Sequence, residues 1–241
     1  KGKHVLVEKP LAINKNELKK IKEYYNKTDK KPVLFTGYNR RFSPHIIRLK
    51  DFIKSYKSPF ILSYRVNAGH ISNSNWVNKM DEGGGRNIGE ACHFYDLFCF
   101  LAESKVGEIS VHSINKYLLN NMDSYHSDLP NENFIVTIKF ENQCICNLIY
   151  TSLGNKKIDK EYLELFIGND IFLLKDYKEL QFVGRKKSIF RTKNQDKGYK
   201  NELMEFFKAI KYSKNKMSIE DQLNVSEISF RVEEIINKYK N

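Results

Sequence analysis

Long apolar runs are missing from this sequence. No stretch approaches the roughly 20 consecutive apolar residues that a helix needs to cross a membrane, and no apolar segment typical of a secretory signal follows the first residues. Apolar residues still make up 41% of the chain, which is enough to build a globular core. We therefore expect a soluble, cytoplasmic protein with no membrane partner.

Arginine is scarce, with 8 arginines against 33 lysines that are spread along the chain among 24 asparagines. Recognition of nucleic acids relies on arginine forks and on clustered basic faces. The net charge of +12 therefore predicts a solvated, lysine-rich surface and no nucleic-acid partner. The same charge would attract an anionic ligand such as a nucleotide or a nucleotide sugar.

Cysteine is also rare, and no two of the four cysteines form a Cys-x-x-Cys pair. Zinc sites and thioredoxin-type redox sites are therefore disfavoured, and reduced, buried thiols are expected. The three glycines Gly83–Gly85 lack the Lys-Ser/Thr pair of a P-loop. The G-x-G-x-x-G turn of dinucleotide-binding domains is absent from the 241 residues. Because the chain opens within an apolar run and without methionine, we interpret it as a fragment of a longer protein.

The first 40 residues predict a strand, a helix and a second strand. The strands are "HVLVEKP" and "KPVLFTGY", and between them a helix runs from an N-cap at Asn14 to about Asn26. This spacing is typical of a βαβ unit, so the strands are expected to be parallel and covered on both faces.

The rest of the chain predicts an α+β domain. Helices are expected over residues 43–56, 87–102, 197–212 and 219–238. Strands are expected at "FILSYRV", "EISVHSINKY", "ENFIVTIKF", "QCICNLIYTS", "EYLELFIG", "DIFLLKD" and "KELQFVG". Short breaks between the later strands suit an antiparallel meander. The predicted organisation is a βαβ remnant over residues 1–40, followed by one large, mostly antiparallel sheet domain over residues 41–241.

Polar side chains follow both strands of the βαβ unit. Lys9 ends the first strand, and Asn39 and Arg40 end the second strand, at the sheet edge where open parallel sheets bind ligands. The Lys9 ammonium would donate a hydrogen bond to a substrate oxygen, and the alternative is an ordinary surface lysine. Arg40 suits a phosphate or polar substrate, and the alternative is a surface ion pair.

The predicted helix over residues 87–102 carries Glu90, His93 and Asp96. Glu90 and His93 lie one turn apart, so both side chains would reach a single ligand atom. A histidine with an ordinary pKa near ~6.5 suits a proton acceptor. No further ligands are evident nearby, so no metal site is expected. Trp76, in the polar loop before the helix, would close over a flat ring or simply anchor the loop.

The order of these segments resembles the Gfo/Idh/MocA oxidoreductases. The resemblance is carried by "GKHVLVEKPLA", "GYNRRFSP", a Trp-containing loop, "GGG" and "HFYDL". Details such as "YRVNAGHI", "KEYLELF" and "DKGY" are similar to the C-terminal half of bi-domain oxidoreductases, which often occur beside surface-polysaccharide genes. The resemblance implies a Rossmann domain followed by an open sheet with helices on one face, and oligomerisation through the other face.

The resemblance also implies roles for individual residues. It assigns Lys9 and His93 to catalysis, with NAD or NADP as cofactor and a sugar or nucleotide sugar as substrate. Glu8, Lys9, Pro10, Arg40 and Trp76 would lie near the cofactor. Asn39, Asn67 and Asp96 would contact the substrate.

Two departures from the family pattern affect these expectations. Many members carry an aspartate four residues before the helix histidine, where this chain has Gly89 followed by Glu90. Glu90 either reaches back with its longer side chain, as a third catalytic residue, or binds a different group of the substrate. The missing glycine-rich turn predicts that this chain alone binds dinucleotide poorly and is inactive. The alternative to an oxidoreductase part is a non-catalytic sheet domain that serves oligomerisation or scaffolding.

Overall fold

The computed structural model describes residues 2–29, 31–69, 71, 75–114, 132–184, 187–213 and 215–238. Its strands are β1 (Val5–Val7), β2 (Leu34–Thr36), β3 (Ile61–Asn67), β4 (Val106–Ser113), β5 (Phe134–Phe140), β6 (Ile145–Thr151), β7 (Glu161–Ile167), β8 (Asp170–Lys175), β9 (Glu179–Val183) and β10 (Ser188–Arg191). Its α-helices are α1 (Lys15–Lys27), α2 (Pro44–Ile53), α3 (Cys92–Ala102), α5 (Tyr199–Tyr212) and α6 (Ile219–Lys238). Short 3₁₀ turns cover Asn39–Phe42 and Trp76–Asn78, and a π-helical turn covers Asn87–Ala91.

Eight strands form one large sheet in the order β10-β9-β8-β7-β3-β6-β5-β4. Neighbouring strands are antiparallel, as predicted, except for the parallel pair β3 and β6. The expected simple meander is therefore wrong at its centre, because β3 lies between two strands that come much later in the chain. Strand β10 was not predicted from the sequence.

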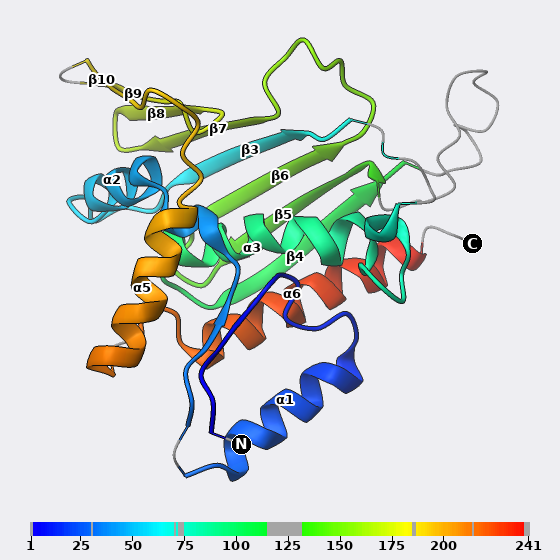
Figure 1. Cartoon of the computed structure of the whole chain (residues 1–241). Helices are drawn as coiled ribbons and strands as arrows, with labels where there is room; N and C mark the ends of the chain where they lie inside the picture. The colour runs from blue at the N-terminus through cyan, green and yellow to red at the C-terminus, as the bar shows by residue number, and fades with distance from the viewer. Residues whose placement is uncertain are drawn as a thin grey trace.

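Helices α3 and α6 lie along one face of this sheet, and α1 lies beyond α6 (Figure 1). Alternate strand residues are buried against these helices, which confirms the predicted α+β class with helices on one face. On the opposite face, in the part of the chain that the structure describes, several apolar side chains remain exposed. These are Ile61, Ile135, Phe166 and Val183.

The first two strands and α1 form the expected βαβ unit, with β1 parallel to β2. The Asn14 side chain caps α1 by accepting from the Glu17 amide at 2.9 Å. The prediction that β1 is covered on both faces is wrong, because Val5 and Leu6 are exposed. Only β2 pairs with β1 among the described residues, and α1 packs partly on α6 instead.

Helix and strand limits also differ from the predictions. The helix expected over residues 87–102 begins with the π-helical turn before α3, and the helix expected to reach residue 56 ends at Ile53. The strand expected at "EISVHSINKY" corresponds to β4, which ends at Ser113. The last three residues of the expected strand, 115–117, lie outside the described residues. Among the described helices, none combines the length and apolar character needed to cross a membrane.

Candidate active site

Lys9 connects the end of β1 to the helix turn before α3. Its Nζ donates a hydrogen bond to the carbonyl oxygen of Gly89 at 2.7 Å, across 80 residues of sequence. Lys9 is half-buried, Glu8 beside it is exposed, and the Lys9–Pro10 peptide bond is cis. The ammonium keeps two further protons for other acceptors. The structure thus brings the predicted Glu-Lys-Pro segment to the helical segment that carries His93.

His93 lies in the first turn of α3 and is only 6% exposed. Its Nδ1 has no hydrogen-bond partner among the described residues, and its ring lies edge-on to Tyr38 at 6.4 Å between centroids. Burial lowers the pKa of His93 well below its ordinary value, and nearby Arg40, Lys9 and Lys197 lower it further. The imidazole is therefore in its neutral form at neutral pH, which is the form that a proton acceptor requires.

Glu90 is bound by three side chains other than Lys9. Its Oε1 accepts a hydrogen bond from Lys160 Nζ at 2.7 Å, and its Oε2 accepts from Arg86 Nη1 at 2.9 Å and from the Tyr150 hydroxyl at 2.5 Å. Burial acts to raise the pKa of Glu90, but Lys160, Tyr150 and Arg86 outweigh it and hold the pKa at about 2. Glu90 is therefore an ionised carboxylate, and Lys9 takes the Gly89 carbonyl in place of a carboxylate partner.

A second buried carboxylate, Glu161, begins β7. Arg40 binds it through two hydrogen bonds of 2.8 and 2.9 Å, Lys197 Nζ donates to it at 2.6 Å, and the Tyr64 hydroxyl donates at 2.7 Å. Glu161 thus occupies the Nε and Nη2 atoms of Arg40. The predicted contact of Arg40 with a cofactor stays a prediction. Lys197 and Lys160 were missed by sequence reasoning, although they lie within "DKGY" and "KEYLELF".

Asn39 and Asn67 form hydrogen bonds with the backbone of Lys197 and Lys160, respectively. The Asn39 Nδ2 donates to the Lys197 carbonyl at 2.9 Å. The next residue, Gly198, has φ +91°, and a Cβ there would lie 2.4 Å from the Ser43 amide nitrogen, so only glycine fits. The Asn67 backbone amide donates to the Lys160 carbonyl at 2.7 Å. Substrate contacts for both asparagines remain predictions.

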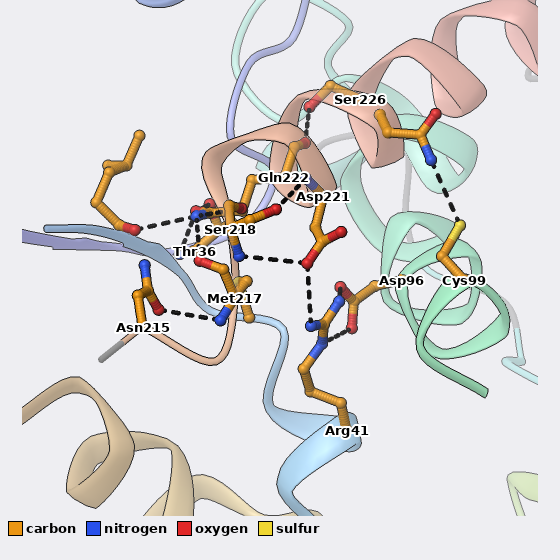
Figure 2. Close-up of polar contacts among 12 residues, drawn as sticks. Thr36, Arg41, Asp96, Cys99, Asn215, Met217, Ser218, Asp221, Gln222 and Ser226 are labelled. Atoms are coloured by element: carbon orange, nitrogen blue, oxygen red, sulfur yellow. Dashed lines mark hydrogen bonds and ion pairs between the residues drawn. The ribbon is translucent and has the colours of Figure 1, made fainter. Parts of the chain in front are cut away.

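Asp96 lies in α3 and faces Arg41, which Figure 2 shows linked to both Asp96 and Asp221. Arg41 binds both Asp96 oxygens, one of them at 2.9 Å from Nε, and approaches Asp221 at 4.0 Å. Burial raises the pKa of Asp96 to about 6, against the effect of Arg41. The pair anchors α3 to the turn after β2, and a substrate contact for Asp96 stays a prediction.

The remaining candidates are more peripheral. Trp76 is 52% exposed, and its loop includes residues 70 and 72–74, which lie outside the described residues. A cleft of about 710 Å³ lies near Cys99 and Asp221, and neither Lys9 nor His93 lines it. The described residues hold no group of three or more side chains suited to a metal ion. All four cysteines are unpaired thiols.

Residues 53–240 match the model of the oxidoreductase family's C-terminal alpha/beta domain, which covers most of the chain. The chain belongs to the Gfo/Idh/MocA oxidoreductase family. Over a stretch of 53 residues, the present chain is 40% identical to myo-inositol 2-dehydrogenase of Thermotoga maritima. This stretch is 22% of the present chain and only 15% of the length of that relative.

Solved structures in the family share the fold at low sequence identity. A UDP-N-acetylglucosamine 3-dehydrogenase from Acidithiobacillus ferrooxidans has 15% identity and a TM-score of 0.78, covering 99% of this chain and 72% of its own. A levoglucosan dehydrogenase in complex with NADH has 19% identity and the same TM-score, with coverage of 99% and 72%. An oxidoreductase described from Thermotoga maritima has 16% identity and a TM-score of 0.75, with coverage of 97% and 70%.

Proposed function

We propose that the chain forms the substrate-binding and acid–base part of an NAD- or NADP-dependent oxidoreductase that acts on a hydroxyl or carbonyl carbon of a sugar or nucleotide sugar. The observation that carries this proposal is the Lys9–Gly89 hydrogen bond, which brings a half-buried ammonium to the helical segment of a neutral His93. The family's sugar dehydrogenases, one of them solved with NADH, support the substrate and cofactor classes.

In this proposal His93 accepts the hydroxyl proton as the alcohol is oxidised, and returns it in the reverse direction. Lys9 donates a charge-assisted hydrogen bond to the same oxygen and stabilises the negative charge that develops there. In support of these roles, the His93 ring has a nitrogen without a hydrogen-bond partner among the described residues, and the Lys9 ammonium keeps two protons beyond its bond to Gly89. When bound, a nicotinamide would supply the acceptor or donor of the hydride.

Glu8, Lys9 and Pro10 are the residues of this chain that would hold the nicotinamide end of the cofactor, because they follow the parallel strand β1. The 241 residues contain no G-x-G-x-x-G turn, so this chain alone is expected to bind NADH or NADPH too weakly for calorimetry. Tight binding would contradict that expectation. Following the resemblance to bi-domain oxidoreductases, we place the reaction in cytoplasmic surface-polysaccharide metabolism.

The exposed apolar face of the large sheet favours a second role. Ile61, Ile135 and Phe166 are exposed on the side that no described helix covers, and such patches commonly mark interfaces. We propose that this face joins copies of the chain into a homo-oligomer. A protein with this role alone would be a non-catalytic assembly domain.

The test is cofactor-dependent oxidation and reduction of sugars and nucleotide sugars by the intact protein that contains these residues. Lys9→Ala and His93→Asn should each lower kcat at least about 100-fold, the usual effect of removing an acid–base group. Lys3→Ala, which changes an exposed lysine before the same strand, is the matched control and should keep full activity. Unchanged activity in Lys9→Ala would remove the catalytic proposal and leave the assembly domain.

A further inference from the structure

Positive charge exceeds negative charge around the turn that holds Glu90 and His93. Five basic side chains are linked there to two carboxylates and to the carbonyl oxygens of Gly89 and Gly69, and a third carboxylate, Glu233, accepts a hydrogen bond from Asn87 in the same turn. The basic residues are Lys9, Arg40, Arg86, Lys160 and Lys197, and the two carboxylates linked to them are Glu90 and Glu161. Because the neutral His93 adds no charge, this part of the site is suited to an anion.

Lys160 differs from the other donors to Glu90 in being accessible. Its side chain is 40% exposed, whereas the Arg86 side chain is fully buried and Tyr150 is buried in β6. If Lys160 turned to another acceptor, Glu90 would keep the Arg86 ion pair and the Tyr150 hydroxyl. Lys160 can therefore exchange its partner without leaving a buried carboxylate uncompensated.

The backbone that carries Lys160 is fixed on both sides. Its carbonyl accepts the hydrogen bond from the Asn67 amide, and the Asn67 Nδ2 holds the Asn155 carbonyl at 2.8 Å. Glu161 follows immediately and is tied to Arg40. Only the flexible stem of Lys160 has to move for its ammonium to meet a ligand.

We propose that the substrate carries an oxyanion, either a carboxylate or a phosphate, which binds Lys160 in place of Glu90. This inference rests on the proposed function and adds to it the charge of the substrate. An uncharged sugar would leave the excess of positive charge beside the reacting carbon uncompensated. An anionic sugar would offset it.

The effect on His93 is consistent with this assignment. Burial lowers the pKa of His93, and Arg40, Lys9, Lys197 and Lys160 lower it further. A bound anion close to these cations would counter their effect and raise the pKa of His93 toward its ordinary value. The histidine would then be a stronger base when substrate is present than when it is absent.

The test is isothermal titration calorimetry of the 241-residue chain at low ionic strength. The probes are D-glucuronate, glucose 1-phosphate and UDP-glucose, with uncharged D-glucose and sodium sulfate as references. At least one anionic sugar should bind more tightly than glucose, and Lys160→Gln should weaken it about tenfold, as expected for one charge-assisted hydrogen bond. The probe with the largest loss identifies whether the anion is a carboxylate, a phosphate monoester or a diphosphate.

Two further variants sharpen the result. Lys157→Gln removes an exposed lysine from the same loop and should bind like the wild type, and Lys160→Arg should restore most of the affinity. The inference would be overturned if glucose and every anionic sugar bound equally well, or if no sugar bound at all. It would also be overturned if Lys160→Gln had no effect on binding. Sulfate binding as tight as that of the sugars, with the same dependence on Lys160, would indicate an adventitious ion only. Because no cofactor is used, these results are separate from the redox assay of the Lys9 variant.

Discussion

A Cβ atom on Gly89 would lie 2.3 Å from the carbonyl oxygen of Gly83. The glycine segment Gly83–Gly85 therefore packs directly on the helix turn, and it does not form a phosphate loop. The contact also leaves no space for the aspartate that many family members carry at position 89. The Gly89 carbonyl oxygen accepts the hydrogen bond from Lys9 instead.

Replacing Gly89 should destabilise the protein and loosen this contact. Gly89→Ala is expected to lower the free energy of unfolding by about 1–3 kcal/mol, the usual cost of overpacking. Gly89→Asp should lower the free energy of unfolding further, and its carboxylate should not serve as a partner for Lys9. Urea unfolding measures both changes. Gly107→Ala, where the nearest atom to the new Cβ is 3.3 Å away, is the control and should cost less. Equal stability of Gly89→Ala and the wild type would contradict the close packing.

Breaking the Arg41–Asp96 pair should destabilise the protein strongly. Arg41→Met or Asp96→Leu is expected to cost about 3–5 kcal/mol, because each leaves a buried charged partner uncompensated. The double variant Arg41→Met with Asp96→Leu should recover part of this loss. Lys54→Met removes an exposed pair with Asp51 and should change stability by less than about 1 kcal/mol. Additive losses in the double variant would show that the two residues are not coupled.

Glu202 should make the stability of the protein depend on pH. Burial, with Glu8 and Asp96 adding to it, raises the pKa of Glu202 from 4.5 to about 8. The folded state then keeps a proton that the unfolded state loses, so the free energy of unfolding falls as the pH rises from 4.5 to 8. Glu202→Gln should flatten this dependence in urea unfolding across that range. The exposed Glu227→Gln is the control, and a slope unchanged in Glu202→Gln would be evidence against the buried, protonated acid.

The main features of the fold followed from local patterns. The alternation in segments such as Phe134–Phe140 identified most strands, and the Asn14 cap identified the start of α1. The parallel pairing of β3 with β6 could not be inferred, because strand order depends on contacts between distant segments. The continuous apolar run of β1 predicted a buried strand, but Val5 and Leu6 are exposed. The residues of a strand do not by themselves determine which other segments cover it.

The site was predicted in part. Lys9 and His93 are recognisable because each lies within a distinctive motif at the end of a strand or in a helix turn. Lys160 and Lys197 are two among 33 lysines, and their positions depend on backbone contacts with Asn67 and Asn39. The periodic pattern of apolar residues in the sequence does not predict such contacts. Asn67 and Asn39 were recognised as important residues, but their observed contacts are with the chain itself.

The central position of β3 has a consequence for how the chain folds. Both of its neighbours are synthesised much later, β6 from Ile145 and β7 from Glu161, so β3 cannot pair when it first leaves the ribosome. Until then its apolar side chains, such as Leu62 and Tyr64, have no sheet to join. Folding rates fall as contacts become more distant in sequence, and we therefore expect slow, late assembly of the large sheet. The chain should depend on chaperones during synthesis more than its final fold suggests.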